Sequence, residues 1–167
     1  MAFSTEKAKE KLKTLSNTQQ SIQSTSQWCL FHTKHAKNVV SVWNSQFNAS
    51  NSTPEYRLAL FYLCNDILQL ARPKMERHAL FFSSFKAVLP TVLANVTNSN
   101  GDNIGKYSRV LDVWKQRSVY DECTIRVFKN SLESPSKSSS SGSRTILTNN
   151  AGGRQITIFR EAWYHAP

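Results

Sequence analysis

Apolar residues recur at the spacing of one helix face along most of this chain. The clearest case is residues 36–47, where the positions i, i+3, i+4, i+7 and i+11 are Ala36, Val39, Val40, Trp43 and Phe47. Similar segments follow one another up to about residue 133, with short connections and no convincing strand. The pattern predicts an all-α domain of about eight helices.

Cap residues and prolines set the expected ends of these helices. Thr53 followed by Pro54 predicts the start of a helix, and Pro73 predicts its end after Ala71, because proline disfavours the α conformation of the residue before it. Pro90 predicts a kink, or a break between two short helices. The other expected helices begin at Ser4 or Thr5, span residues 18–35, 36–47 and 104–118, and begin after a cap at Asp121.

The composition changes at Ser134, where the sequence continues as SPSKSSSSGSR. A Ser-rich segment contains too little apolar surface to offset the entropy of ordering it. We therefore expect one domain over residues 1–133, and a disordered linker and tail over residues 134–167. The tail carries a weak hairpin signal around NNAGG and no heptad pattern, so a dimerising coiled coil is not expected.

The charge favours an anionic partner. Lysine and arginine number 21 against 11 aspartate and glutamate, a formal net charge of +10. Nucleic acid, an acidic membrane surface and a phosphorylated peptide all fit this excess. The odd count of three cysteines, each within a helical pattern, indicates a reducing compartment, and the sequence predicts neither a signal peptide nor a membrane span.

The stretch LFYLCNDILQL, residues 60–70, places polar side chains inside an apolar run. On a helix, Tyr62, Asn65, Asp66 and Gln69 stand at i, i+3, i+4 and i+7 and form one stripe. Burying a carboxylate without a partner is costly, so the stripe is expected to line a groove. The alternative is that these side chains satisfy one another, or neighbouring helix ends, within the core.

Two arginines supply a complementary charge. Arg109 and Arg117 are eight residues apart, which on a helix is about two turns, or roughly 12 Å. The guanidinium fork suits bidentate binding of phosphate, so the pair is a candidate phosphate site. An ordinary solvated helix face is the alternative.

The sequence gives no basis for catalysis or for a cofactor. Cys29, His32 and His35 have a C-x-x-H-x-x-H spacing, but steps of three drift around a helix and no second ligand cluster accompanies them, so a metal site is not expected. GDNIGK lacks the P-loop pattern, and no nucleophile elbow or zinc-protease motif is present. We expect a binding module and not an enzyme.

Three separated stretches resemble the CTD-interacting domain (CID), which binds the heptad-repeat tail of RNA polymerase II. They are LSNTQQSIQSTSQW (residues 15–28), YLCNDILQ (62–69) and SRVLDVWKQRSVY (108–120). The chain is more similar to the branch for termination and pre-mRNA regulation (CREPT-like) than to the cleavage-factor branch. The resemblance implies about eight helices in a right-handed superhelical stack, related to VHS and ENTH domains.

The resemblance also implies a ligand and a role for each site residue. The ligand would be a Tyr-Ser-Pro-Thr-Ser-Pro-Ser heptad phosphorylated at its second position, bound in the nucleus to couple transcription to termination or 3′-end processing. Within the family's N-D-x-x-Q motif, which ends at Gln69, Asn65 and Asp66 would hydrogen-bond the peptide, beside a wall shaped by Tyr62. Asn17 would contact the peptide, and the phosphate would be held by Arg109 and Arg117.

Two competing functions use the same features differently. A membrane or trafficking adaptor of the ENTH/VHS kind would place the lysine-rich first helix, around KAKEKLK, on anionic lipid. An RNA-binding domain would use the net positive charge and would show a steep salt dependence that does not require Asp66. The turn ARPKMER and the loop NASNST depart from the family pattern, so contacts beyond one heptad are not predicted.

Overall fold

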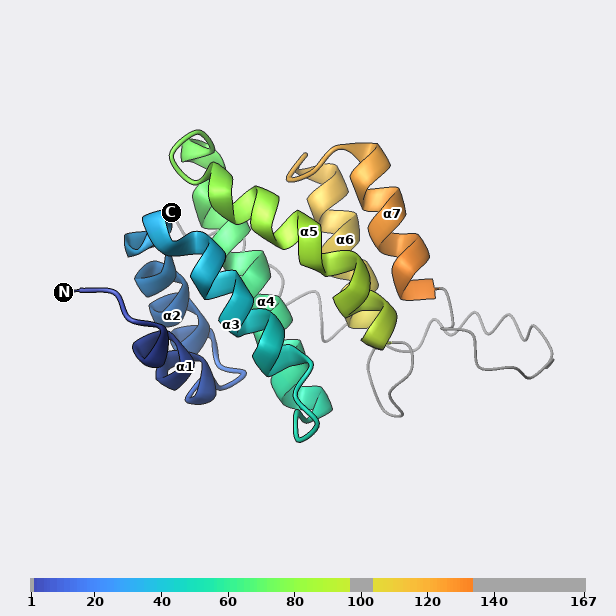
Figure 1. Ribbon diagram of the computed structural model, residues 1–167. Coiled ribbons are helices and arrows are strands. Elements are labelled where there is room, and N and C mark those ends of the chain that lie inside the picture. Colours follow the sequence, from blue (N-terminus) through green and yellow to red (C-terminus); the bar gives the residue numbers. More distant parts are fainter. Residues whose placement is uncertain (1, 97–103, 134–167) are drawn as a thin grey trace. The chain divides into compact units, whose positions relative to one another are not determined.

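The computed structural model describes residues 2–96 and 104–133, and this part of the chain contains helices and no strand. The all-α prediction is therefore confirmed. Seven α-helices are joined by short connections, two of which contain a 3₁₀ turn (Figure 1). In chain order the elements are α1 (Thr5–Lys13), α2 (Gln19–Phe31), η1 (Thr33–His35), α3 (Ala36–Phe47), α4 (Pro54–Ala71), η2 (Arg72–Lys74), α5 (Ala79–Val96), α6 (Ile104–Gln116) and α7 (Glu122–Glu133).

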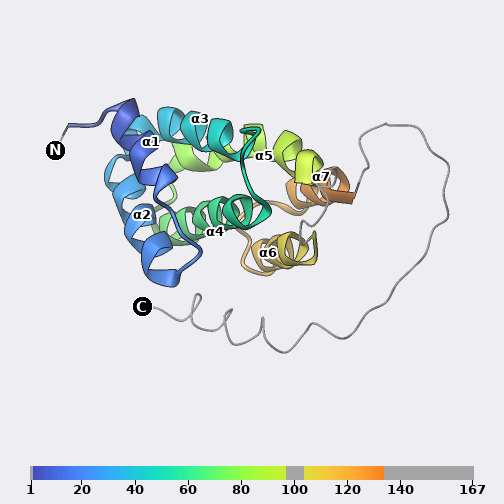
Figure 2. The ribbon, with the colours of Figure 1, turned by 90° about the horizontal axis from the view of Figure 1, so that it is seen from below.

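The helices form two layers, seen end-on in Figure 2. One layer contains α1, α3, α5 and α7, and each of these helices packs on the next. The other contains α2, α4 and α6, with α4 in the middle and in contact with both neighbours. The middle position explains why α4 is the most buried helix of its layer.

Three helices begin at a capping side chain, and Thr53 among them was predicted as a cap. The side-chain oxygens of Ser4, Thr18 and Thr53 accept hydrogen bonds from backbone N–H groups three residues later, at 3.2, 3.3 and 3.2 Å. Each bond satisfies one of the four N–H groups that a helix start leaves without a partner. Pro54 occupies the first turn of α4, where its missing N–H removes no helical bond.

One predicted boundary is wrong, and one of the two effects predicted for Pro90, a break, is not found. The helix expected over residues 18–35 ends at Phe31, because His32 leaves the helical conformation with φ −98° and ψ 34°, and η1 follows. Pro90 does not divide its segment and lies inside the continuous helix α5. The described residues therefore contain seven α-helices where about eight were expected.

The core is built from large rings. Trp43, Phe61, Phe85 and Trp114 are each at most 1% exposed. The Trp43 indole N–H donates to the Leu60 carbonyl at 2.7 Å, and the Trp43 ring meets Phe85 edge-on with centroids 5.2 Å apart. These contacts join α3 to α4 and to α5.

Helix α5 is long and apolar enough to cross a membrane by length and composition alone. Its apolar side chains have another explanation, because Phe81, Phe85, Leu89 and Leu93 are fully buried and the helix packs on α3 and α7. It is a core helix of this domain.

All described residues lie in the first of two units into which the chain divides, Met1–Ser136. The domain boundary expected at residues 133–134, the disorder expected over 134–167 and the hairpin signal in the tail fall outside the described residues and stay predictions.

Candidate functional site

The predicted polar stripe of Tyr62, Asn65, Asp66 and Gln69 lies on α4, between α2 and α6 (Figure 2). Two of them are buried. Asp66 is 6% exposed and Asn65 is 3% exposed. Each has a partner on a different neighbouring helix, so α4 is joined through polar side chains to both sides of its layer.

Asp66 interacts with α2. The Ser26 hydroxyl, which is fully buried, hydrogen-bonds the Asp66 Oδ2 atom and also lies 2.9 Å from the Gln23 carbonyl oxygen. Burial raises the pKa of the Asp66 carboxyl, and the hydrogen bond with Ser26 opposes that rise. Helix α2 itself contains no charged residue that could neutralise the carboxylate.

Asn65 interacts with α6. Its side-chain oxygen accepts a hydrogen bond from the Trp114 indole N–H at 2.8 Å, and both groups are buried. A buried neutral pair of this kind fixes how two helices pack, because breaking it leaves a polar atom without a partner. The bond holds α6, which carries Arg109 and is followed by Arg117, against α4.

The groove prediction assumed that the whole stripe on α4 is exposed, and the structure shows that it is not. Tyr62 and Gln69 are half-buried, whereas Asn65 and Asp66 have partners within the domain, as the alternative interpretation proposed. The Gln69 side-chain nitrogen is buried and has no acceptor among the described residues. The stripe thus carries a carboxylate and an amide nitrogen about one helical turn apart, both buried.

The remaining predicted residues flank α4 on both sides. Asn17 is exposed just before α2, next to the cap at Thr18. Arg109 is half-buried on α6, and half-buried Arg117 follows the last residue of that helix. The Arg117 backbone N–H still donates to the Val113 carbonyl at 2.9 Å, so the helical spacing from Arg109 extends through Arg117.

The site lies within a region of recognisable family sequence. Residues 6–128 match the CID domain, and this range includes every predicted site residue. The chain belongs to the CID family. The predicted resemblance to CTD-interacting domains is confirmed.

Curated relatives of this CID carry the name "Regulation of nuclear pre-mRNA domain-containing protein". The chain is 33% identical to protein 1A of Mus musculus over 132 residues, which is 78% of this chain and 41% of that protein. It is 36% identical to protein 1B of Homo sapiens over 133 residues, 79% of this chain and 39% of that protein. With protein 2 of Mus musculus it shares 34% identity over 122 residues, 73% of this chain and 8% of that protein. The CID thus corresponds to less than half of each of these relatives.

Two hydrogen-bonding groups of the site were not predicted from the sequence. Ser26 was not singled out, although it lies at i+4 from Ile22 and i−3 from Cys29 on the buried face of α2, a spacing that marks it as inward-facing. Trp114 was assigned to the apolar core, and its N–H donor was not considered. Together they supply the hydrogen bonds that orient the polar pair of α4.

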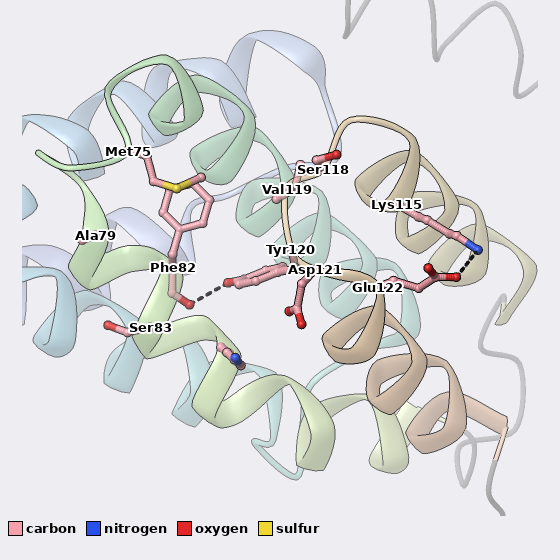
Figure 3. Close-up of a pocket in the computed structure, with 11 residues that line it drawn as sticks. Met75, Ala79, Phe82, Ser83, Lys115, Ser118, Val119, Tyr120, Asp121 and Glu122 are labelled. Carbon is pink, nitrogen blue, oxygen red and sulfur yellow. Dashed lines mark hydrogen bonds and ion pairs between the residues drawn. The ribbon is translucent and has the colours of Figure 1, made fainter.

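A separate cavity of about 740 Å³ lies between α5 and the turn after α6 (Figure 3). Tyr120 donates to the Phe82 carbonyl at 2.7 Å within its lining, and an ion pair of 3.1 Å joins Lys115 to Glu122. None of the predicted site residues lines this cavity. Within the described part of the chain, no group of three or more His, Cys, Asp or Glu side chains could hold a metal ion.

Replacing Asp66 with asparagine should stabilise this CID at neutral pH. Because burial raises the pKa of Asp66, the native state holds the proton more tightly than the unfolded chain does, and ionisation at higher pH costs stability. Asparagine removes that cost and can still accept from Ser26. We expect the gain in the free energy of unfolding, measured with urea, to be largest at neutral pH, to shrink as the pH falls below the native pKa of Asp66, and to vanish below the pKa of Asp66 in the unfolded chain.

The control for this prediction is Asp112→Asn, which removes an exposed carboxylate paired with Lys129 and should change stability by at most about 1 kcal/mol. An Asp66→Asn protein that is less stable than the wild type at neutral pH would contradict the prediction. It would show that the carboxylate gains more from the fold than it loses by burial.

Proposed function

We propose that this CID binds the heptad-repeat tail of the largest subunit of RNA polymerase II in its phosphorylated form, as a non-catalytic module in the nucleus. Binding would couple a transcribing polymerase to termination or 3′-end processing, through factors bound elsewhere. Membership of the CID family supports the class of ligand. The names of the relatives, which refer to regulation of nuclear pre-mRNA, support the process and the compartment.

The observation that carries the proposal is the pairing of α4 with the arginine-bearing helix α6. The bond from Trp114 to Asn65 fixes α6 against α4, which supports a site that combines Asp66 with Arg109 on α6 and Arg117 just after it. A phosphoserine carries about −1.5 to −2 charges at neutral pH and three acceptor oxygens, which the two guanidinium groups complement.

The polar groups of α4 would set the register of the peptide. The Asp66 atom Oδ1 would accept from a peptide N–H or hydroxyl, because Ser26 engages Oδ2. The buried Gln69 nitrogen would donate to a peptide carbonyl and gain the acceptor it lacks within the described residues. Tyr62 and Asn17 would contact the peptide on either side. With so few anchors a single heptad should bind modestly, and repeats would add avidity.

An isotope-labelled sample of the full chain, titrated with two-heptad peptides, tests this proposal. We expect amide shifts over residues 62–69 and 106–117, with tighter binding when the second heptad position is phosphorylated. Shifts that avoid these segments would refute the site, and equal affinity for both peptides would refute the phosphate preference. Salt-sensitive binding to phosphoinositide vesicles that is indifferent to Asp66→Ala and Arg109→Ala would favour the membrane-adaptor alternative.

A further inference from the structure

Five aromatic rings gather where α2 ends. Phe3, which precedes α1, stacks on His35 with ring centroids 4.4 Å apart and planes at 6°. The Trp28 and His32 centroids are 4.6 Å apart, and Phe31 meets His32 edge-on at 5.1 Å. The cluster therefore joins the N-terminal segment, the last turn of α2 and η1.

Phe31 projects from this cluster. It is 73% exposed, the highest value among the large hydrophobic side chains that the structure describes as exposed, and it alone among them exceeds one half. Exposing a phenyl ring gives no folding stability, because the hydrophobic gain requires removal from water. The rings behind it hold the end of α2 in place, so Phe31 is presented on a rigid base.

Exposed cations lie on two segments that meet near the end of α2. Lys34 is exposed in η1, three residues after Phe31. The turn between α4 and α5 lies against η1, because the His78 ring hydrogen-bonds the Thr33 hydroxyl at 2.9 Å. This turn carries exposed Lys74 and Arg77, and neither residue forms an ion pair among the described residues.

The electrostatics of two buried histidines agree with a positive field at this surface. Burial first, and then Arg77 and Lys74, lower the pKa of His78. Burial, together with His35 and Lys7, lowers the pKa of His32. Cations of the α4–α5 turn therefore act on His78, whose ring hydrogen-bonds Thr33 in η1.

We propose that this surface, formed by Phe31, Lys34, Lys74 and Arg77, binds single-stranded nucleic acid. One exposed ring on a rigid base stacks a base of any sequence, and the cations contact the flanking phosphates. An anionic membrane is a poorer match, because interfacial anchors insert a broad apolar face, and of the exposed apolar side chains described at this end of α2, in the α4–α5 turn and at the start of α5, Phe31, Met75 and Leu80, only Phe31 is more than half exposed. The surface shares no residue with the proposed peptide site, so the CID would hold a polymerase tail and a transcript separately.

The test uses the full chain and a fluorescent oligouridylate of about twelve nucleotides, a length within single-strand site sizes. Phe31→Ala should weaken binding roughly 5- to 150-fold, the range that loss of one base–aromatic stack gives, and should leave the salt dependence unchanged because phenylalanine is neutral. The double variant Lys74→Ala/Arg77→Ala should reduce the slope of log affinity against log salt by about 1.4, since each phosphate contact on a single strand contributes about 0.7.

The matched controls lie on α7, where Val127 is exposed and apolar and Arg126 is exposed and cationic. Val127→Ala and Arg126→Ala should each leave RNA affinity within about twofold, a change of about 0.4 kcal/mol. A deoxyuridylate of equal length shows whether the 2′-hydroxyl contributes, and comparable binding still supports the proposal. Phosphopeptide affinity should be unchanged in Phe31→Ala, which separates this surface from the peptide site.

The proposal is overturned if Phe31→Ala and Val127→Ala bind RNA equally well, or if the salt slope is unaffected by Lys74→Ala/Arg77→Ala. It is also overturned if RNA does not bind at all. Binding of phosphatidylserine vesicles that requires Phe31, without RNA binding, would assign the surface to a membrane.

Discussion

Replacing Trp114 with alanine is expected to lower the free energy of unfolding by about 3–5 kcal/mol, the cost of removing a large buried aromatic side chain. Trp114 is fully buried, and its ring lies 5.7 Å from Phe61, 5.8 Å from Tyr120 and 6.2 Å from Phe128, measured between centroids. The change opens a cavity between α4, α6 and α7. It also leaves the buried Asn65 oxygen without its indole donor. Urea unfolding followed by circular dichroism measures the loss.

The conservative change Trp114→Phe separates the hydrogen bond from the packing. It retains much of the ring but removes the N–H, and a buried acceptor without a partner costs about 1–3 kcal/mol. Adding Asn65→Leu to Trp114→Phe should recover part of that loss, because the side-chain oxygen that loses the indole donor is then absent as well. The control is Trp28→Ala, which removes a half-buried tryptophan on α2 and should cost less. If Trp114→Phe and wild type unfold at the same urea concentration, the bond to Asn65 contributes nothing to stability.

Local signals were sufficient to place most helix starts. Ser4, Thr18 and Thr53 cap helices near the predicted starts, because a cap depends on a side-chain oxygen and an N–H three residues away. The apolar spacing of residues 36–47 gave the bounds of α3 for a similar reason. Where the determining contacts lie within about one helical turn, sequence patterns contain the needed information.

The end of α2 and the continuity of α5 at Pro90 depend on contacts or solvent exposure that local patterns do not encode. The end of α2 at Phe31 coincides with the packing of Phe3 against the rings of His32 and His35, a contact across some thirty positions of sequence. Pro90 removes an N–H that would bond the carbonyl of Lys86, an exposed residue, so water can satisfy that carbonyl and α5 continues.

In the candidate site, too, local geometry was predictable and tertiary contacts were not. Helical geometry alone predicted that Asn65 and Asp66 share one side of α4 with Gln69. It could not predict that Asp66 would meet Ser26, 40 positions away, or that Asn65 would meet Trp114, 49 positions away. These tertiary bonds decide which carboxylate oxygen remains for a ligand. They also give the polar residues a structural role beside the binding role that we propose.

Replacing Arg109 or Arg117 with alanine is expected to remove most of the preference for phosphorylated peptide. A hydrogen bond to a charged group contributes about 1.5–3 kcal/mol, so each change should weaken binding of the phosphopeptide roughly 10- to 150-fold. The unphosphorylated peptide lacks the charge and should lose little. Isothermal titration of both peptides against both variants, as a double-mutant cycle, measures the coupling between each arginine and the phosphate.

Two further variants give this prediction its specificity. Arg117→Lys keeps the charge but loses the planar fork, so an intermediate loss would indicate bidentate binding and no loss would indicate a point-charge contact. Arg126→Ala removes an exposed arginine of α7 and should change neither affinity. If Arg109→Ala and Arg117→Ala weaken both peptides equally, the arginines do not read the phosphate. Their half-buried stems would then act through packing on α6, and the phosphate preference would have to be assigned to other cations of the domain.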